Sequence, residues 1–154
     1  MSFNIRFDGD LYTLPAPVYA FVENGWETGY SDYMVEPNGV EVFILDRNEQ
    51  VLHATICNFS NVAQPPEFCY VTTIRSTDTI TNVPLELPGG ITRDSSYLDI
   101  VNAHGVPDET TSLSSMTFYT YGNDESSILF TMNSQTNDII AIDVSHKPSE
   151  LELP

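Results

Sequence analysis

Basic residues are the scarcest class of side chain in this 154-residue sequence. Five lysines and arginines stand against 22 aspartates and glutamates, which gives a formal net charge of −17 at pH 7. Direct binding of nucleic acid is therefore not expected, because that affinity comes from lysines and arginines that neutralise phosphates. The expected partner is another protein with a basic surface, although strong net charge also serves solubility alone.

Long apolar runs are absent too. No segment reaches the roughly 18 consecutive apolar residues of a membrane-spanning helix, so no membrane span is expected. The first ten residues, MSFNIRFDGD, lack the positive region and the apolar stretch of a signal peptide. We expect a cytoplasmic protein if Met1 is native, and a secreted or cell-surface protein if a signal segment has been removed.

The sequence has only two cysteines, Cys57 and Cys69, on either side of a segment that resembles a long hairpin loop. On facing strands they would form a disulfide worth about 2–3 kcal/mol. Two reduced, buried thiols are an equally good interpretation. Without a CxxC pair or a histidine at ligand spacing, the cysteines do not predict a zinc site.

Motifs for catalysis are also missing. The three histidines, His53, His104 and His146, form no HExxH pair, and no serine lies in a GxSxG elbow. The carboxylate pairs lack the spacing of a calcium loop. We expect no catalytic residue, no metal and no cofactor. A small hydrolase is a third hypothesis, which requires a serine or cysteine beside one of the histidines.

The stretch LPGGITRDSSYLDIVNAHGVPDE, residues 87–109, begins like a ligand loop. Gly89 and Gly90 lack the lysine and the spacing of a phosphate-binding loop. A negative side chain at Asp94 would compete with an anion for the helix start. Thr92 or Asp94 is the expected N-cap. The glycines are interpreted as turns around a helix.

Apolar periodicity predicts the elements of the chain. A hairpin is expected over residues 3–14 about Asp8-Gly9, followed by a short helix that ends at Asn24-Gly25. Strands are expected over 40–45, 51–59 and 69–76. A second helix over 95–105 and three further strands, over 116–121, 126–133 and 138–145, complete the pattern.

In the second half, VPLELP (residues 83–88) precedes the helix as LYTLP does in the first. The order strand, helix, three strands therefore occurs twice, which is typical of a degenerate duplication. We predict an α+β fold with two tandem helix-plus-antiparallel-meander repeats. Their sheets form one curved antiparallel sheet with both helices on one face. The repeats span residues 1–76 and 77–145 of one structural unit, and residues 146–154 form a flexible acidic tail.

The residues GIT, SSYLDIVNAHGVPDE, MTFYTYGND, SILFTMN and NDIIAIDV together resemble the repeat unit of the β-lactamase-inhibitor-protein-like and small outer-membrane-lipoprotein-like domains. The N-terminal half is similar to segments of uncharacterised Gram-positive surface proteins. The resemblance implies a module that acts by binding or as an assembly scaffold, without shared catalytic residues. The chain lacks a lipoprotein cysteine near its start, which departs from the anchored members.

Aromatic residues supply the predicted binding surface. Tyrosines on the solvent-exposed face of a half-buried sheet, surrounded by carboxylates, would bind another protein, since tyrosine and tryptophan dominate interface hot spots. Any one of them could instead cover the edge of the core. The proposed set is Trp26, Tyr30, Tyr33, Tyr119, Tyr121, Asp124 and Glu125.

The first functional hypothesis is thus a non-catalytic protein-binding or inhibitor-type module that acts through an exposed sheet face. The alternative is an acidic mimic of nucleic acid that inhibits a cationic DNA- or RNA-binding protein, of the phage counter-defence type. Mimicry requires carboxylates along one ridge, spaced like phosphates. An even spread of charge would favour the first hypothesis.

Overall fold

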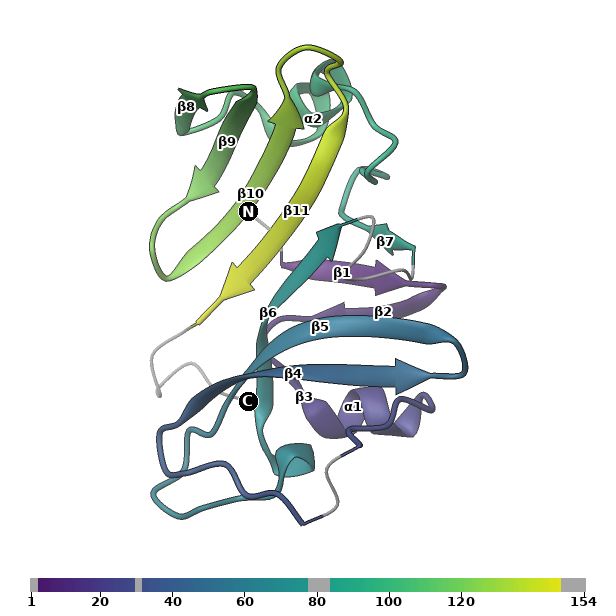
Figure 1. The fold of residues 1–154 in the computed structure, drawn as a ribbon, viewed down its shortest axis with the longest axis vertical. Coiled ribbons are helices and arrows are strands. Elements are labelled where there is room, and N and C mark those ends of the chain that lie inside the picture. The colour runs from purple at the N-terminus through teal and green to yellow at the C-terminus, as the bar shows by residue number, and fades with distance from the viewer. Residues whose placement is uncertain (1–2, 30–31, 78–83, 148–154) are drawn as a thin grey trace.

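The computed structural model describes residues 3–29, 32–77 and 84–147. About 50% of the structure is strand and 12% is helix. The predicted α+β layout of two helix-plus-meander repeats is therefore wrong, and the fold is mostly β (Figure 1). The helices of the described residues are too short to form a layer, and segments expected to be connections form strands.

An antiparallel sheet of eight strands dominates the structure, and it contains all six strands that periodicity predicted outside the N-terminal hairpin. Two meanders meet where β6 pairs with β11. A short strand pairs with β6, and β8 forms the edge beyond β9. The strands are β3 (Ala16–Pro17), β4 (Val40–Arg47), β5 (Gln50–Cys57), β6 (Tyr70–Thr77), β8 (Glu109–Leu113), β9 (Met116–Gly122), β10 (Ser126–Asn133) and β11 (Ile139–His146).

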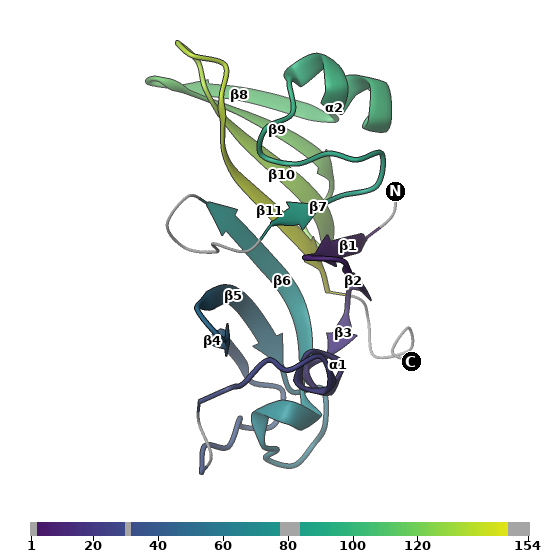
Figure 2. The same cartoon turned by 90° about the vertical axis from the view of Figure 1, so that its right-hand side faces the viewer.

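The predicted N-terminal hairpin is confirmed, but it belongs to a separate sheet. It comprises β1 (Asn4–Phe7) and β2 (Asp10–Thr13), with Asp8 and Gly9 both at positive φ in the turn. β1 also pairs with β7 (Leu85–Glu86), which completes a three-stranded sheet. This small sheet lies between the two helices in the layer that covers one face of the large sheet (Figure 2).

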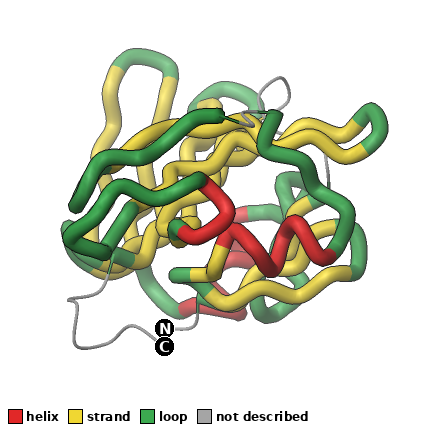
Figure 3. The backbone as a smooth tube through the Cα atoms, turned by 90° about the horizontal axis from the view of Figure 1, so that it is seen from below, coloured by secondary structure: helices red, strands yellow, loops and turns green. Residues whose placement is uncertain are grey.

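Both predicted helices are present and short. α1 (Val18–Glu23) begins after Pro17 without a side-chain cap. α2 (Tyr97–His104) begins at a capping box in which Ser96 and Asp99 bond each other's backbone N–H groups. The prediction of Thr92 or Asp94 as N-cap is wrong, because these residues lie in a turn before the cap. A 3-10 turn, η1 (Pro66–Phe68), precedes β6. Figure 3 shows how little of the backbone is helical.

The core lies between one face of the eight-stranded sheet and a layer made of α1, α2 and the three-stranded sheet (Figure 2). One row of directly paired residues crosses six strands and is buried throughout, so removal of apolar surface from water holds both meanders together. The row is Phe43, Ala54, Ile74, Val144, Ile128 and Tyr121.

The glycine loop before α2 is part of this packing. Leu87 and Ile91 form a bridge around the two glycines. Gly89 has a φ of +87°, and a Cβ built there would lie 2.7 Å from the Cβ of Ala103 in α2. The absence of a side chain at Gly89 thus allows the loop to approach the helix.

β11 ends at His146, so the last strand extends into the predicted tail. Residues 148–154 lie outside the described part of the chain.

Candidate functional site

The structure disperses the aromatic residues predicted to bind a partner. Trp26 is 1% exposed, and the guanidinium of Arg47 lies 4.6 Å from the centre of its ring. Tyr33 is exposed and its hydroxyl donates to the carboxylate of Glu41. Tyr30 lies outside the described residues. Trp26 and Tyr33 therefore do not form one exposed surface, because Trp26 is buried.

Tyr119 and Tyr121 share one face of β9, as predicted, but that face is the covered one. Tyr119 stacks on Tyr97 of α2 with ring centres 4.6 Å apart. Tyr121 is buried and its hydroxyl donates to the carbonyl of Gly105 at 2.8 Å. Burial raises the pKa of Tyr121 to about 12. The prediction that both tyrosines face solvent is wrong, because α2 packs on them.

His104 belongs to the same cluster. Its ring lies 5.8 Å from that of Tyr121 and 6.3 Å from that of Phe130. Nε2 of His104 is buried without a hydrogen-bond partner. Burial lowers the pKa of His104, although the end of a helix favours a cation. This histidine is therefore a packing residue.

Asp124 and Glu125 lie in the turn between β9 and β10 and are exposed. The carbonyl of Glu125 accepts a hydrogen bond from the backbone of Lys147 at 2.8 Å. The pair is thus exposed at the end of the meander, whereas Tyr121 is buried and Tyr119 is partly buried.

The face of the large sheet opposite the core is covered by no described helix or strand (Figure 2). Its central row of directly paired residues crosses seven strands, from the edge at β4 to the edge at β8. The row is Ile44, His53, Arg75, Asp143, Leu129, Thr120 and Glu109. We call this surface the uncovered face.

An ion pair lies at the middle of the uncovered face. Nη1 of Arg75 lies 3.1 Å from Oδ1 of Asp143. Burial raises the pKa of Asp143, against the lowering effect of Arg75. In the next row, the hydroxyls of Thr73 and Ser145 are hydrogen-bonded at 2.8 Å. The centre of this face is thus polar and ordered.

The β4 end of the uncovered face is apolar. Val42 is 70% exposed and Ile44 is 38% exposed. Val42 pairs with Thr55, so both side chains project from the same face as the ion pair. His53 on β5 lies between Ile44 and Arg75 in the central row. Neighbouring exposed aliphatic side chains of this kind occur in protein-binding surfaces.

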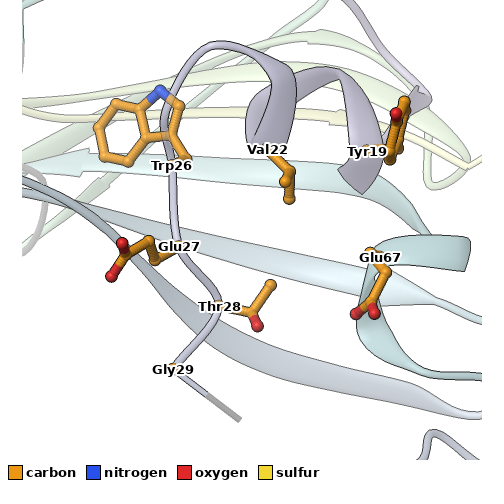
Figure 4. Close-up of a pocket in the computed structure, with 7 residues that line it drawn as sticks. All are labelled: Tyr19, Val22, Trp26, Glu27, Thr28, Gly29 and Glu67. Carbon is orange, nitrogen blue, oxygen red and sulfur yellow. The ribbon is translucent and has the colours of Figure 1, made fainter. Parts of the chain in front are cut away.

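A cavity of about 570 Å³ lies beside α1, on the covered side of the molecule (Figure 4). α1 contributes Tyr19 and Val22, and the segment after it contributes the remaining residues of one wall. Glu67 comes from η1. The cavity is lined by Tyr19, Val22, Trp26, Glu27, Thr28, Gly29 and Glu67. Of these, only Trp26 was a predicted site residue.

The pattern of α1 contains a signal for this cavity. Val18 and Phe21 are buried, whereas Tyr19 and Val22 are exposed. The helix therefore has a second pair of large apolar residues at i, i+3 spacing, which the core does not use. Glu67 had no such signal, because only the chain fold brings η1 next to α1.

A serine lies beside a histidine, as the hydrolase hypothesis requires. Ser126 and His146 are a cross-strand pair of β10 and β11, and the Ser126 hydroxyl contacts Nδ1 of His146. Phe3 stacks on the imidazole with ring centres 4.5 Å apart. Neither Ser126 nor His146 lines the cavity beside α1. A nucleophile needs a substrate pocket and an orienting group as well.

Cys57 and Cys69 are free, buried thiols. Burial raises the pKa of Cys69 to about 11, which leaves it protonated near neutral pH. The thiol of Cys57 lies 3.4 Å from the hydroxyl of Thr72.

The carboxylates are not confined to one element. Asp8 and Asp10 of the first hairpin form ion pairs with Arg47. Oδ2 of Asp8 lies 3.8 Å from Nη2 of Arg47, and Oδ2 of Asp10 lies 2.9 Å from Nη1. Others lie in η1, in α2 and in the turns at the far ends of β9 and β10. Among residues 3–29, 32–77 and 84–147, no single strand or helix thus carries a row of carboxylates of the kind that nucleic-acid mimicry requires.

Comparison of the chain with protein-family models, with curated proteins and with solved structures finds no match. Within residues 3–29, 32–77 and 84–147, no group of three or more potential metal ligands occurs. In the same ranges no helix has the length and apolar character to cross a membrane.

Proposed function

We propose that the chain is a non-catalytic protein-binding module of inhibitor type, and that the uncovered face binds a partner with a basic surface. The observation that carries the proposal is the combination of exposed Val42 and Ile44 with the Arg75–Asp143 pair on a face without a covering layer. An antiparallel sheet commonly packs one face on the core and exposes the other to solvent, where it is accessible to a partner.

The roles of the residues follow from their positions. Val42 and Ile44 supply apolar area at the β4 end, where removal of water is the main source of affinity. Arg75 is half exposed, so it can donate to a carbonyl or carboxylate oxygen of the partner, while its pairing with Asp143 offsets its repulsion from a basic surface. The net charge of −17 attracts a basic partner at long range and raises the rate of association.

The resemblance to β-lactamase-inhibitor-like domains supports the same class of function, since members of that group act by binding. The binding residues differ from those expected from the sequence: strands β4, β6 and β11 contribute the surface, in place of the tyrosines of β9.

The test is affinity capture from a lysate of the source organism, followed by binding measurements with the purified captured protein. Val42→Glu is expected to weaken binding at least tenfold, because it places a charge in the apolar part of the interface. Val106→Glu is the matched control, since Val106 is 78% exposed in the loop after α2. The proposal fails if both variants bind as the wild type does, or if both lose binding equally.

A second measurement separates the binding from general attraction to an acidic protein. Binding at about 0.05 and 0.5 M salt should differ, since screening removes long-range attraction. A partner of the uncovered face remains sensitive to Val42→Glu at the higher salt concentration. A partner that is lost completely at high salt, irrespective of the variant, contradicts the proposal.

A further inference from the structure

The cavity beside α1 is a second surface, separate from the uncovered face. Figure 4 shows Val22 and Thr28 in its middle, with Glu27 on one side and Glu67 with Tyr19 on the other. An adjoining cavity of about 310 Å³ shares Tyr19 and Glu67 and extends past Phe68. We call the cavity of about 570 Å³ the trough: it has apolar residues in its wall and a carboxylate on each side, and Glu67 lies where the adjoining cavity begins.

The two carboxylates of this trough are not used by the fold. The side chains of Glu27 and Glu67 have no ion-pair or hydrogen-bond partner among residues 3–29, 32–77 and 84–147. Glu27 is held in place through its backbone, which pairs with the backbone of Asp46 at 2.7 and 3.0 Å. The cavity lining contains no lysine or arginine. The charge of the trough is therefore uncompensated.

The apolar walls are also unusual for a surface. Tyr19 is 53% exposed and lines both cavities, and Phe68, which lines the adjoining one, is 65% exposed. Such side chains favour an aliphatic chain lying over them, and an aromatic ring attracts a cation. Thr28 offers a hydroxyl oxygen as an acceptor for an N–H group.

We propose that this trough binds a linear organic cation with an ammonium group at each end, that is, an alkyl diamine or polyamine. One ammonium pairs with Glu27 and the other with Glu67, while the methylene chain lies over Val22 and Tyr19. The volume lies within the range of small-molecule sites, roughly 300–1,000 Å³. The cavity beside α2 differs, because it is lined by small and polar residues and its Asp99 is engaged in the helix cap.

The probes are 1,5-diaminopentane, the monoamine 1-aminopentane and the neutral 1-pentanol, added to the full chain at low ionic strength. Trp26 lines the cavity and is the only tryptophan of the chain, so its fluorescence reports on this site. Amide chemical shifts of Thr28, Gly29 and Glu67 locate the binding. The diamine is expected to bind about threefold to fivefold more tightly than the monoamine, as for one exposed ion pair.

Glu27→Gln and Glu67→Gln test the two ends separately. Each substitution is expected to weaken binding of the diamine about threefold to fivefold. The affinity for the monoamine should change less than the affinity for the diamine. Glu109→Gln, on the edge strand β8, removes the same charge far along the sheet and is the matched control. Because all three side chains lie at the surface, the melting temperatures of the three variants should be close to that of the wild type.

Three outcomes would overturn this inference. The first is equal affinity for the diamine and the monoamine. The second is a loss in Glu109→Gln equal to that in the cavity variants, which would show attraction to the net charge alone. The third is the absence of shifts at Thr28, Gly29 and Glu67. None of these outcomes bears on the uncovered face, which Val42→Glu tests independently.

Discussion

The two meanders of the large sheet differ in what packs on their core faces. The first, β4–β6, is covered by the six-residue α1, which has no side-chain cap and has an open trough beside it. The second, β9–β11, is covered by α2, which has a capping box and packs on aromatic rings. Both helices pack on an aromatic ring, since Phe21 of α1 stacks on Tyr12 with ring centres 3.9 Å apart. The helices differ in the N-terminal cap and in the residues that line the cavity beside each of them.

Phe130→Ala is the strongest test of the aromatic packing under α2. Phe130 is fully buried and lies 6.0 Å, between ring centres, from Tyr121. The free energy of unfolding should fall by about 3–5 kcal/mol, measured by denaturant titration. Phe68→Ala, at the exposed last residue of η1 before β6, should cost less than about 0.5 kcal/mol. Similar losses in both variants would end the distinction between the meanders.

Gly89→Ala and Gly90→Ala form a matched pair at the loop before α2. Both glycines have positive φ, so alanine at either position costs about 1 kcal/mol or more. Only at Gly89 would the new Cβ meet Ala103, at 2.7 Å. Thermal melting should therefore show a larger loss for Gly89→Ala. Equal losses would mean that α2 moves freely away from the loop.

Ser96→Ala removes the cap that distinguishes α2 from α1. We expect a loss of about 1 kcal/mol, because the Asp99 N–H loses its acceptor at 3.1 Å. Ser112→Ala on the exposed strand β8 is the control and should leave the unfolding free energy nearly unchanged. A loss confined to Ser112→Ala would contradict the role of the capping box.

His104 makes the second meander sensitive to pH. Burial lowers its folded-state pKa below 6.5, so the unfolded chain takes up a proton first as the pH falls. The stabilisation is complete above about pH 6.5 and declines below it. Between pH 7.5 and 5.5, the free energy of unfolding should fall more for the wild type than for His104→Met. The variant keeps every carboxylate of the wild type, so the difference between the two curves reports on His104 alone. Parallel curves for the two proteins would refute this role.

The thiols of the first meander test its packing without a change in sequence. At pH 8, Cys57 and Cys69 should react with a thiol reagent much more slowly in the native protein than in denaturant, because both are buried. Two thiols per chain should titrate after unfolding without a reductant. A count of zero would instead favour the disulfide that the sequence leaves open.

Much of the secondary structure could be predicted from the sequence, because strand and helix periodicity are local. The hairpin about Asp8-Gly9, both helices and six strands of the large sheet follow from it. β3 and β8 were missed, since a two-residue strand and the fully exposed strand of Glu109–Leu113 have no apolar alternation. β7 lies within VPLELP, which the comparison of the two halves placed before the second helix. The predicted α+β class was wrong because the unpredicted strands add to the sheets and the helices are short.

The candidate sites were less predictable. Alternation along β9 correctly placed Tyr119 and Tyr121 on one face, but it does not say which face a helix covers. The trough beside α1 needs Glu67, whose contact with α1 joins residues far apart in the chain.

The sequence by itself determined the negative charge, the hairpin turn at Asp8-Gly9 and the positions of most helices and strands along the chain, because these depend on composition and on neighbours along the chain. Only the tertiary structure decided that Trp26 and Tyr121 are buried, that Ile44 and Glu109 lie in one row across the sheet, and that Glu27 and Glu67 share a trough. The physical reason is that burial and strand register depend on contacts between distant segments, which alternation along one strand does not specify.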